Sequence, residues 1–416
     1  MQSSLVADAP PSRRLVRSAV GIVLGQFGVF TALLAPAVVS LAVHVARICP
    51  HNRTVVLSTA LTIGAIVAML ANPVFGALSD RTRSRFGQRR IWVLAGCILG
   101  FAGLFALSRS TGPFGVYFGW GMTQIGYNAA IAAIAALLND VVPDQYRGRF
   151  ASFMGIAQYS AFLSASYIVS LCAYSDSAMF LAPGLLGFVG AAALAFCVPE
   201  VAVAAEHRTR APSGGASRLS LSGLMVSRDF FWAFVSRLFT TAAPFTFLSY
   251  QTFYYVDVYK IQVSQAAKLV FQASVADTAC LLLFSAVCGW LSDRLGLRKV
   301  FVWVASALIG AMLLVIPHVS SFTTLLLFVG VMGGAHGVYS SVDHALVIEV
   351  LPDKKRAARD IGVMNIAGVL PQSIVPALAP LLIGFGGDHG YLVYFGFGAL
   401  CAFIGALAIL PVRAVR

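Results

Sequence analysis

The residues best suited to proton transfer lie close together near the C-terminus of the chain. His336, Tyr339, Ser340, Asp343 and Val347 are separated by three or four positions, so a helix would place all five on one face. A histidine and a carboxylic acid on one face of a poorly solvated helix can pass a proton between them. We predict this chemistry for Asp343 and His336, with a purely structural hydrogen-bonded pair as the alternative.

The segments that carry these residues are long and apolar. Hydrophobic residues make up 59% of the 416 residues and charged residues 11%, whereas a soluble domain has about 25% charged residues. A helix needs about 20 apolar residues to cross a bilayer, and we predict twelve such helices. Their expected ranges are 17–43, 55–78, 91–108, 113–138, 150–172, 179–198, 230–257, 266–291, 300–317, 322–348, 361–384 and 391–411.

Two further charged residues lie inside these predicted helices. Arg237 is about eight residues into its helix, or roughly 12 Å along the axis. Asp277 is near the middle of the following helix. Because charge inside a membrane span is costly and by default marks function, we expect both residues to take part in proton coupling. For Arg237, the alternative is that its long side chain extends to the lipid headgroups.

A short motif occurs twice and relates the two halves of the chain. The sequence Gly-Ala-Leu-Ser-Asp-Arg at 76–81 returns as Gly-Trp-Leu-Ser-Asp-Arg at 289–294, an offset of 213 residues. A second pair, Asp-Val-Val-Pro-Asp-Gln-Tyr-Arg at 140–147 and Glu-Val-Leu-Pro-Asp-Lys-Lys-Arg at 349–356, has an offset of 209. Two unrelated motifs at nearly one offset indicate a duplicated structural unit.

The repeat and the distribution of charge predict the domains and the orientation. We expect an N-terminal six-helix bundle at 1–198, a cytoplasmic linker at 199–229 and a C-terminal six-helix bundle at 230–416. An even number of helices places both termini on one side, where 23 of the 29 Lys and Arg residues fall, against 5 on the other side. The positive-inside rule then predicts cytoplasmic termini in the inner membrane. The net charge of +13 reflects this topology and contact with anionic lipids, not nucleic-acid binding.

The first repeated motif resembles a family signature. Residues 76–81, continuing as Arg-Phe-Gly-Gln-Arg-Arg at 85–90, resemble the loop 2–3 signature of the major facilitator superfamily. Residues 79–87, 231–234 and 342–353 are similar to its glycoside–pentoside–hexuronide and sucrose–proton symporter-like branch. The resemblance covers nearly the whole chain. It implies an all-α integral membrane fold of twelve helices in two pseudo-symmetric six-helix bundles.

The acids of the repeated motif have a physical role at the membrane surface. A small residue at Gly76 allows two helices to approach closely. Asp80 can then meet a helix N-terminus or an arginine such as Arg147. The resemblance implies that this contact is a latch that stabilises the outward-open form; the alternative is that the acids only interrupt basic loops. The predicted latch residues are Gly76, Asp80, Arg81, Arg147, Gly289, Asp293, Arg294 and Arg356.

Polar and aromatic side chains inside the predicted helices are candidates for a solute-binding site. Amides and aromatic faces suit sugars or amphiphilic organic molecules, although a single such residue is more often an interhelical hydrogen bond. The predicted binding residues are Gln26, Gln124, Tyr127, Asn128, Gln158, Tyr159, Tyr250, Gln251, Tyr254, Tyr339, Asn365 and Gln372. In the helix at 361–384, Pro371, Pro376 and Pro380 are expected to break the helix.

These features together predict a proton-coupled secondary active transporter of a small organic solute that works by alternating access. Sugar-like symport is favoured on the resemblance. The first two helices lack the carboxylates of sodium-coupled members, which favours protons over sodium. The alternatives are a proton-driven exporter of a small amphiphile or secondary metabolite, a lipid flippase and a passive facilitator.

No enzyme is expected, because the chain has no HExxH or GxSxG motif and no cluster of histidine and aspartate. The expected partners are the solute, protons and membrane lipids. No cofactor, metal or nucleic acid is expected, and we expect a monomer.

Overall fold

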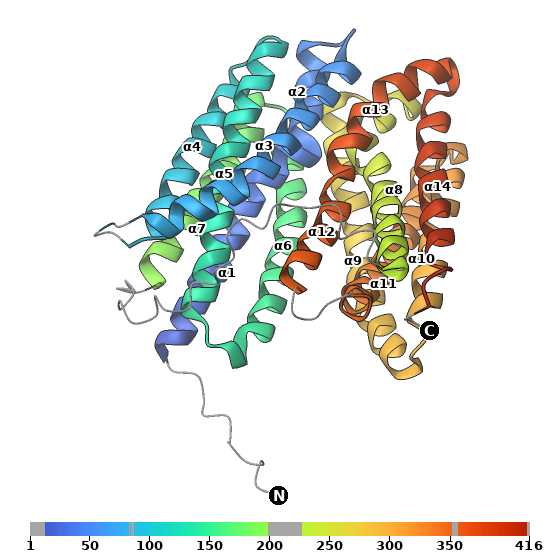
Figure 1. Cartoon of the computed structure of the whole chain (residues 1–416). Helices are drawn as coiled ribbons and strands as arrows, with labels where there is room; N and C mark the ends of the chain where they lie inside the picture. Colours follow the sequence, from blue (N-terminus) through green and yellow to red (C-terminus); the bar gives the residue numbers. More distant parts are fainter. Residues whose placement is uncertain (1–12, 83, 85–86, 199–226, 352–356, 414–416) are drawn as a thin grey trace, which may run out of the picture.

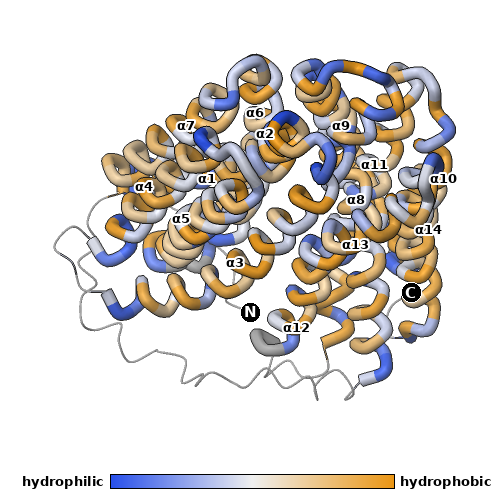
Figure 2. Tube along the Cα trace, turned by 90° about the horizontal axis from the view of Figure 1, so that it is seen from above, coloured by the Kyte–Doolittle hydropathy of each residue, from blue (hydrophilic) through white to orange (hydrophobic). Residues whose placement is uncertain are grey.

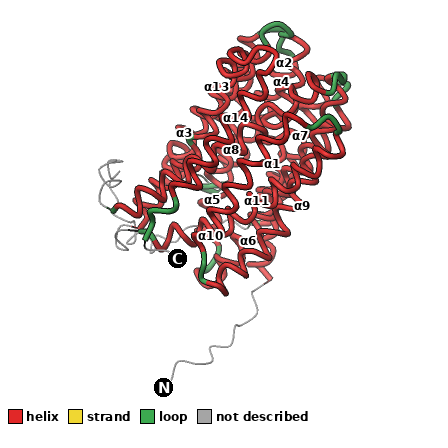
Figure 3. The backbone as a smooth tube through the Cα atoms, turned by 90° about the vertical axis from the view of Figure 1, so that its right-hand side faces the viewer, coloured by secondary structure: helices red, strands yellow, loops and turns green. Residues whose placement is uncertain are grey.

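The fold is a bundle of long helices, shown in the computed structural model of Figure 1. The structure describes residues 13–82, 84, 87–198, 227–351 and 357–413. Within these ranges the regular secondary structure is entirely helical, and loops connect the helices at the two ends of the bundle (Figure 3). The predicted all-α fold is therefore confirmed.

The first half of the chain contains six membrane-length rods. The first rod is continuous through three segments, with a short π-helical stretch beginning at Pro36, a residue that has no N–H to donate to the helix. The elements are α1 (Arg13–Ala35), η1 (Pro36–Ser40), α2 (Leu41–Ile48), α3 (Arg53–Arg81), α4 (Arg90–Ser108), α5 (Pro113–Val141), α6 (Asp144–Cys172) and α7 (Asp176–Cys197).

The second half also contains six rods, and its fifth is divided in two. The elements are α8 (Arg228–Val258), α9 (Val263–Leu295), α10 (Arg298–Val315), η4 (Ile316–His318), α11 (Phe322–Glu349), α12 (Ala357–Val369), α13 (Pro371–Gly386), η6 (Gly387–His389) and α14 (Gly390–Ala408). The division falls where the chain reaches Pro371, which occupies the first turn of α13. Pro376 and Pro380 lie inside α13, so only one of the three prolines expected to break this rod does so.

Among the described residues, ten candidate membrane spans result when helices are selected by length and hydropathy alone. One of them, Asp360–Ala408, contains two of the predicted spans. The helix α8 is not among the ten; its sequence contains four threonines, three tyrosines and four charged residues. All twelve predicted helices are nevertheless present, and most boundaries agree within a few residues. Hydrophobic residues run along most of their length (Figure 2).

The two halves contact each other mainly through two pairs of helices, α3 with α13 and α6 with α9. The internal repeat relates α3 to α9 and α6 to the α12–α13 rod, so the two pairs are equivalent in the two halves. The beginning of α1 and the end of α14 lie at the same end of the bundle (Figure 1). We call this end the terminal end and the other the opposite end. The predicted linker falls between the halves; residues 199–226 lie outside the described residues.

Candidate functional site

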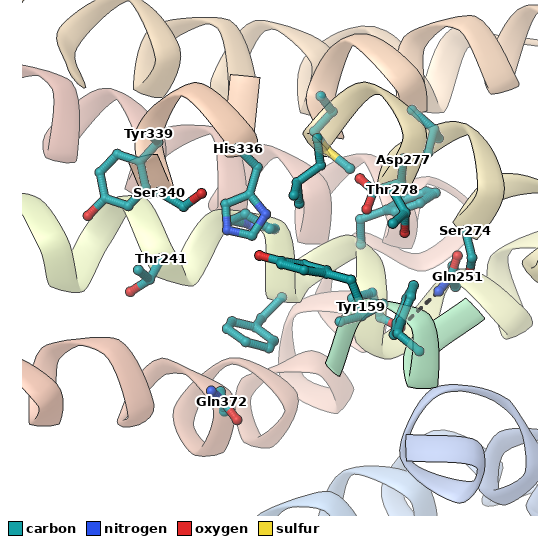
Figure 4. Close-up of a pocket in the computed structure, with 18 of the residues that line it drawn as sticks. Tyr159, Thr241, Gln251, Ser274, Asp277, Thr278, His336, Tyr339, Ser340 and Gln372 are labelled. Atoms are coloured by element: carbon teal, nitrogen blue, oxygen red, sulfur yellow. Dashed lines mark hydrogen bonds between the residues drawn. The ribbon is translucent and has the colours of Figure 1, made fainter. Parts of the chain in front are cut away.

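A cavity of about 370 Å³ lies between the two halves, lined mostly by the second half. The helices α8, α9 and α11 form most of its wall, and α6 contributes three side chains from the first half. All four residues predicted to couple protons line this cavity, and they come from three helices of the second half, α8, α9 and α11. They are Arg237, Asp277, His336 and Asp343. Figure 4 labels Asp277 and His336 among the side chains that line the cavity.

One side of the cavity carries a buried ion pair. Arg237 Nη1 lies 3.2 Å from Asp343 Oδ2, and the Tyr339 hydroxyl donates a hydrogen bond of 3.1 Å to Asp343 Oδ1. Tyr339 and Asp343 are one turn apart on α11, so the helix itself brings them together. Gly368 of α12 lies beside the guanidinium, where a Cβ would make ordinary van der Waals contact with its Nε, at 3.6 Å. The charges of Arg237 and Asp343 therefore compensate each other.

Asp277 occupies a different position in the cavity wall. The helices α9 and α11 approach very closely there, because a Cβ on Gly333 would lie 2.4 Å from the Asp277 backbone oxygen and 2.6 Å from its Oδ1. Likewise, a Cβ on Gly337 would lie 2.2 Å from the Leu281 backbone oxygen. Among the described residues, the Asp277 carboxylate has no hydrogen bond or ion pair. Glycines on α11 thus position a carboxylate that has no counter-charge.

His336 and Tyr159 extend into the cavity toward each other from α11 and α6 (Figure 4). The His336 ring likewise has no hydrogen bond within the described parts of the chain. His336 and Asp343 also have separate surroundings, since Asp343 is bonded to Arg237 and Tyr339. In this structure the two residues do not form the hydrogen-bonded pair that was the structural alternative.

Five of the twelve predicted solute-binding residues line the cavity. They are Gln158, Tyr159, Gln251, Tyr339 and Gln372. Sequence reasoning missed its apolar and hydroxyl lining, including Phe162, Phe245, Phe247, Met332, Ser274 and Thr278. Apolar side chains in apolar helices carry no positional signal. Ser274 and Thr278, however, lie three residues before and one residue after Asp277, and this proximity to a charged residue could have identified them.

The other predicted binding residues lie elsewhere. Asn128 donates 2.8 and 2.7 Å hydrogen bonds to the backbone and side-chain oxygens of Gln124, and it accepts one of 3.0 Å from Asn72. The Tyr254 hydroxyl donates to the Ile316 carbonyl oxygen at 2.9 Å. These polar groups therefore bond within their own half. The remaining four are Gln26, which is buried in α1, Tyr127, which is buried in α5, Tyr250, which is buried in α8, and Asn365, which is exposed on α12.

At the terminal end, the acid of the first repeated motif is held by an arginine. Arg89 Nη1 lies 2.6 Å from Asp80 Oδ1, and its Nε lies 3.0 Å from Asp140 Oδ2. We call these three residues the first bracket. The sequence suggested Arg147 as the partner of Asp80, whereas the structure gives that place to Arg89 at the start of α4; Arg147 Nε donates to the Val142 carbonyl oxygen.

The second half repeats this arrangement. Arg298 Nη2 lies 3.0 Å from Asp293 Oδ1, and its Nη1 is paired with Glu349. We call these residues the second bracket. Asp140 and Glu349 belong to the second repeated motif, and Arg89 and Arg298 differ by that motif's offset of 209. Both repeated motifs therefore meet at one contact in each half.

The remaining predicted latch residues have varied surroundings. Gly76 has open space around it, so the predicted close helix approach is not made there in this structure; this end of α3 is exposed. At Gly289, a Cβ would make ordinary contact with Ser341 of α11, at 3.4 Å. Arg81 is exposed, the Arg294 guanidinium lies 5.3 Å from the ring centre of Trp290, and Arg356 lies outside the described residues.

The opposite end holds a contact between the halves that the sequence did not predict. Arg53 Nη2 of α3 lies 2.5 Å from Asp257 Oδ1 of α8, and the Tyr391 hydroxyl donates a 2.5 Å hydrogen bond to Asp257 Oδ2. We call these residues the opposite-end cluster. The Tyr250 hydroxyl adds a 3.0 Å bond to the Thr54 carbonyl oxygen. The two halves are therefore joined by polar contacts at this end.

Comparison with known proteins supports one family. The model of the Major Facilitator Superfamily matches residues 20–276 and 265–416. No curated protein matches the chain.

Several solved structures share the fold. A nucleoside transporter is 14% identical, with a TM-score of 0.74 and coverage of 94% of this chain and 100% of that chain. A D-xylose–proton symporter is 15% identical, with a TM-score of 0.70 and coverage of 95% and 97%. A bacterial homolog of the human lysosomal transporter Spinster, inward-facing and unoccupied, is 10% identical, with a TM-score of 0.71 and coverage of 97% and 96%.

Proposed function

The chain belongs to the major facilitator superfamily of transporters, and on that premise we propose that it couples the movement of a small organic solute to protons. The observation that carries this proposal is the meeting of Arg237, Asp277, His336 and Asp343 in one cavity between the halves. Charged side chains at membrane depth are costly and are retained for transport or proton relay. A cavity at the interface of two repeats is where secondary transporters bind their solutes.

The proposed orientation places the terminal end in the cytoplasm. Its support is the excess of Lys and Arg in the loops predicted at that end. In this orientation the opposite-end cluster of Arg53, Asp257 and Tyr391 closes the outer side of the protein. The conformation described is then inward-facing. Alternating access would require this cluster to separate while the halves close at the terminal end.

The proposed coupling step uses the ion pair on the cavity wall. A proton on Asp343 would remove the negative charge that holds Arg237, and would leave a buried guanidinium without its counter-ion. That guanidinium would then seek another partner, such as a polar group of the solute. Proton binding and solute binding would be linked in this way through one arginine, and the Tyr339 hydroxyl orients the carboxylate in the ion-paired state.

The lining of the cavity bears on the class of solute. Amides at Gln158, Gln251 and Gln372 suit hydroxyl groups, which supports the sugar-like symport favoured by the sequence. Aromatic and aliphatic side chains, however, occupy much of the wall, among them Phe162 and Phe245. That observation supports the second candidate, a proton-driven exporter of a small amphiphile.

Purified protein in liposomes with a trapped pH dye would test the proposal. A panel of sugars and small amphiphiles is added outside, and we expect at least one of them to change the internal pH. The Asp343→Asn variant should bind the same solute without moving protons. Solute transport with no proton movement in the unmodified protein would contradict proton coupling and leave a passive facilitator.

A further inference from the structure

The two acidic side chains in the cavity wall differ in how their charge is compensated. Asp343 is paired with Arg237 and bonded by Tyr339. Asp277 has no hydrogen bond or ion pair among the residues that the structure describes. Because Arg237 and Asp343 compensate each other, Asp277 is the acidic side chain of the described wall that has no counter-ion.

The surroundings of Asp277 have the character of a recognition site. Figure 4 shows Asp277 grouped with Thr278, Ser274 and Gln251 at one end of the cavity, with Thr241, Tyr339 and Ser340 at the other. The rings of Tyr159 and Phe162 from α6 also line the cavity. A carboxylate, short hydroxyl groups and aromatic faces are therefore available to a single ligand.

This combination favours one class of ligand. A buried carboxylate without a partner is costly, and a cationic group beside it removes that cost. Aromatic faces attract cations further. A neutral sugar would offer the Asp277 carboxyl group no counter-ion, and an anion would be repelled by its ionised form. The apolar remainder of the wall suits the body of an amphiphile.

We propose that the cavity selects a protonated amine with an aromatic or aliphatic body, with its ammonium group against Asp277. The body would lie among Tyr159, Phe162 and Phe245. Gly333 is a positioning residue for this site, since its missing side chain leaves space for the carboxylate. This inference rests on the proposed function, because it identifies the solute class of the same cavity.

A matched series of three ligands would test the charge selection. 4-Phenylbutylamine, 4-phenylbutanol and 4-phenylbutyrate share one apolar body and differ in charge. Their binding to purified protein in nanodiscs is measured by titration calorimetry near neutral pH. We expect the amine to bind about 10- to 100-fold more tightly than the alcohol, as for a desolvated charge pair. Equal affinity of amine and alcohol, or no binding of the amine, would overturn the proposal.

Variants identify the group responsible. Asp277→Asn should reduce the affinity for the amine to that for the alcohol, and Asp277→Glu, which keeps the charge, should retain part of the preference. Asp388→Asn, an exposed acid outside the cavity, is the matched control and should bind like the unmodified protein. An amine preference that survives in Asp277→Asn would place the cation elsewhere and refute the assignment.

The outcome is separable from that of the proton experiment. Calorimetry reports binding in the absence of a gradient, so it can show charge selection even if no protons move. A pH change driven by sugars but by no amine would support proton coupling and contradict this inference.

Discussion

The two halves of the molecule are alike at the terminal end and different inside. Each half has a bracket in which one arginine joins the acid of the loop motif to an acid at the end of a later helix. The interior does not follow this symmetry. At the repeat offsets, His336 corresponds to Tyr127, Asp343 to Ile134 and Asp277 to Gly64. Within the described residues, both halves therefore keep the bracket contact, whereas the charged residues that line the cavity belong to the second half alone.

The packing shows how the difference arises. In the first half, a Cβ on Gly64 of α3 would lie 2.1 Å from Nε1 of Trp120 on α5, so the tryptophan fills the space. In the second half the glycine, Gly333, is on α11 and faces Asp277 of α9. A large apolar side chain closes one interior, whereas a carboxylate beside a glycine faces the cavity in the other. The described part of the first half is thus packed at this position, whereas the second half presents an acidic side chain to the cavity.

The largest expected effect comes from breaking the charge pair of the second half. Arg237→Leu leaves Asp343 buried without its cation and should destabilise the protein by about 3–5 kcal/mol. Thermal unfolding in detergent measures this loss, and the double variant Arg237→Leu/Asp343→Leu should recover most of it. If the single variant is as stable as the unmodified protein, the Arg237–Asp343 ion pair does not stabilise the second half.

Adding a methyl group to each of the two close glycines sharpens the comparison. Gly333→Ala and Gly64→Ala should each cost about 1–3 kcal/mol through overpacking, measured as a lowered unfolding temperature. Only Gly333→Ala should also change the preference for amine over alcohol, because it displaces the Asp277 carboxylate. A change in ligand preference caused by Gly64→Ala would contradict the division of labour between the halves.

Substitutions in the two brackets should have smaller effects, and the effect should be larger for the more buried arginine. Arg89 has a side-chain exposure of 11% and Arg298 of 23%, and Arg89 also donates to the Ser79 hydroxyl at 2.7 Å. Truncation to alanine should therefore slow solute transport more at Arg89 than at Arg298, with each ion pair contributing about 1 kcal/mol or less. Initial uptake rates in liposomes would decide this order, and the reverse order would show that exposure does not govern the brackets.

The smallest effect is expected at Gly76. Nothing lies within 4 Å of a Cβ built there, so Gly76→Ala should change stability by less than about 0.5 kcal/mol in the inward-facing form. Transport rates give a second readout: if the closed terminal end needs close helix contact at Gly76, the rate should fall while the unfolding temperature stays constant.

Charge and hydropathy made most of the fold and part of the site predictable. Arg237, Asp277 and Asp343 stand out because they interrupt apolar helices, and all three line the cavity. Gln124 and Asn128 looked equally suitable, yet they bond to each other. Sequence alone does not tell a polar residue satisfied by a neighbour from one facing a cavity.

Contacts between the halves were the least predictable. Arg53 and Asp257 are 204 residues apart and pair only when the halves meet at the opposite end. The contact of Asp80 with Arg89 was also not predicted: the two residues are close in sequence, but the path of the loop between them is not encoded in hydropathy. Such contacts depend on conformational state as well as on sequence.

The opposite-end cluster has a consequence for the environment in which the protein works. Its two ions, Arg53 and Asp257, are each about one-third exposed, at 27% and 30% of their side chains. Separating them replaces one short contact by two hydrated ions. Dissolved salt stabilises the separated ions more than the joined pair, because it screens the attraction between exposed charges over a length of about 8 Å at physiological ionic strength. In the proposed orientation, the balance between the inward- and outward-facing forms should therefore shift with the ionic strength of the outer medium, even when solute and proton concentrations are fixed.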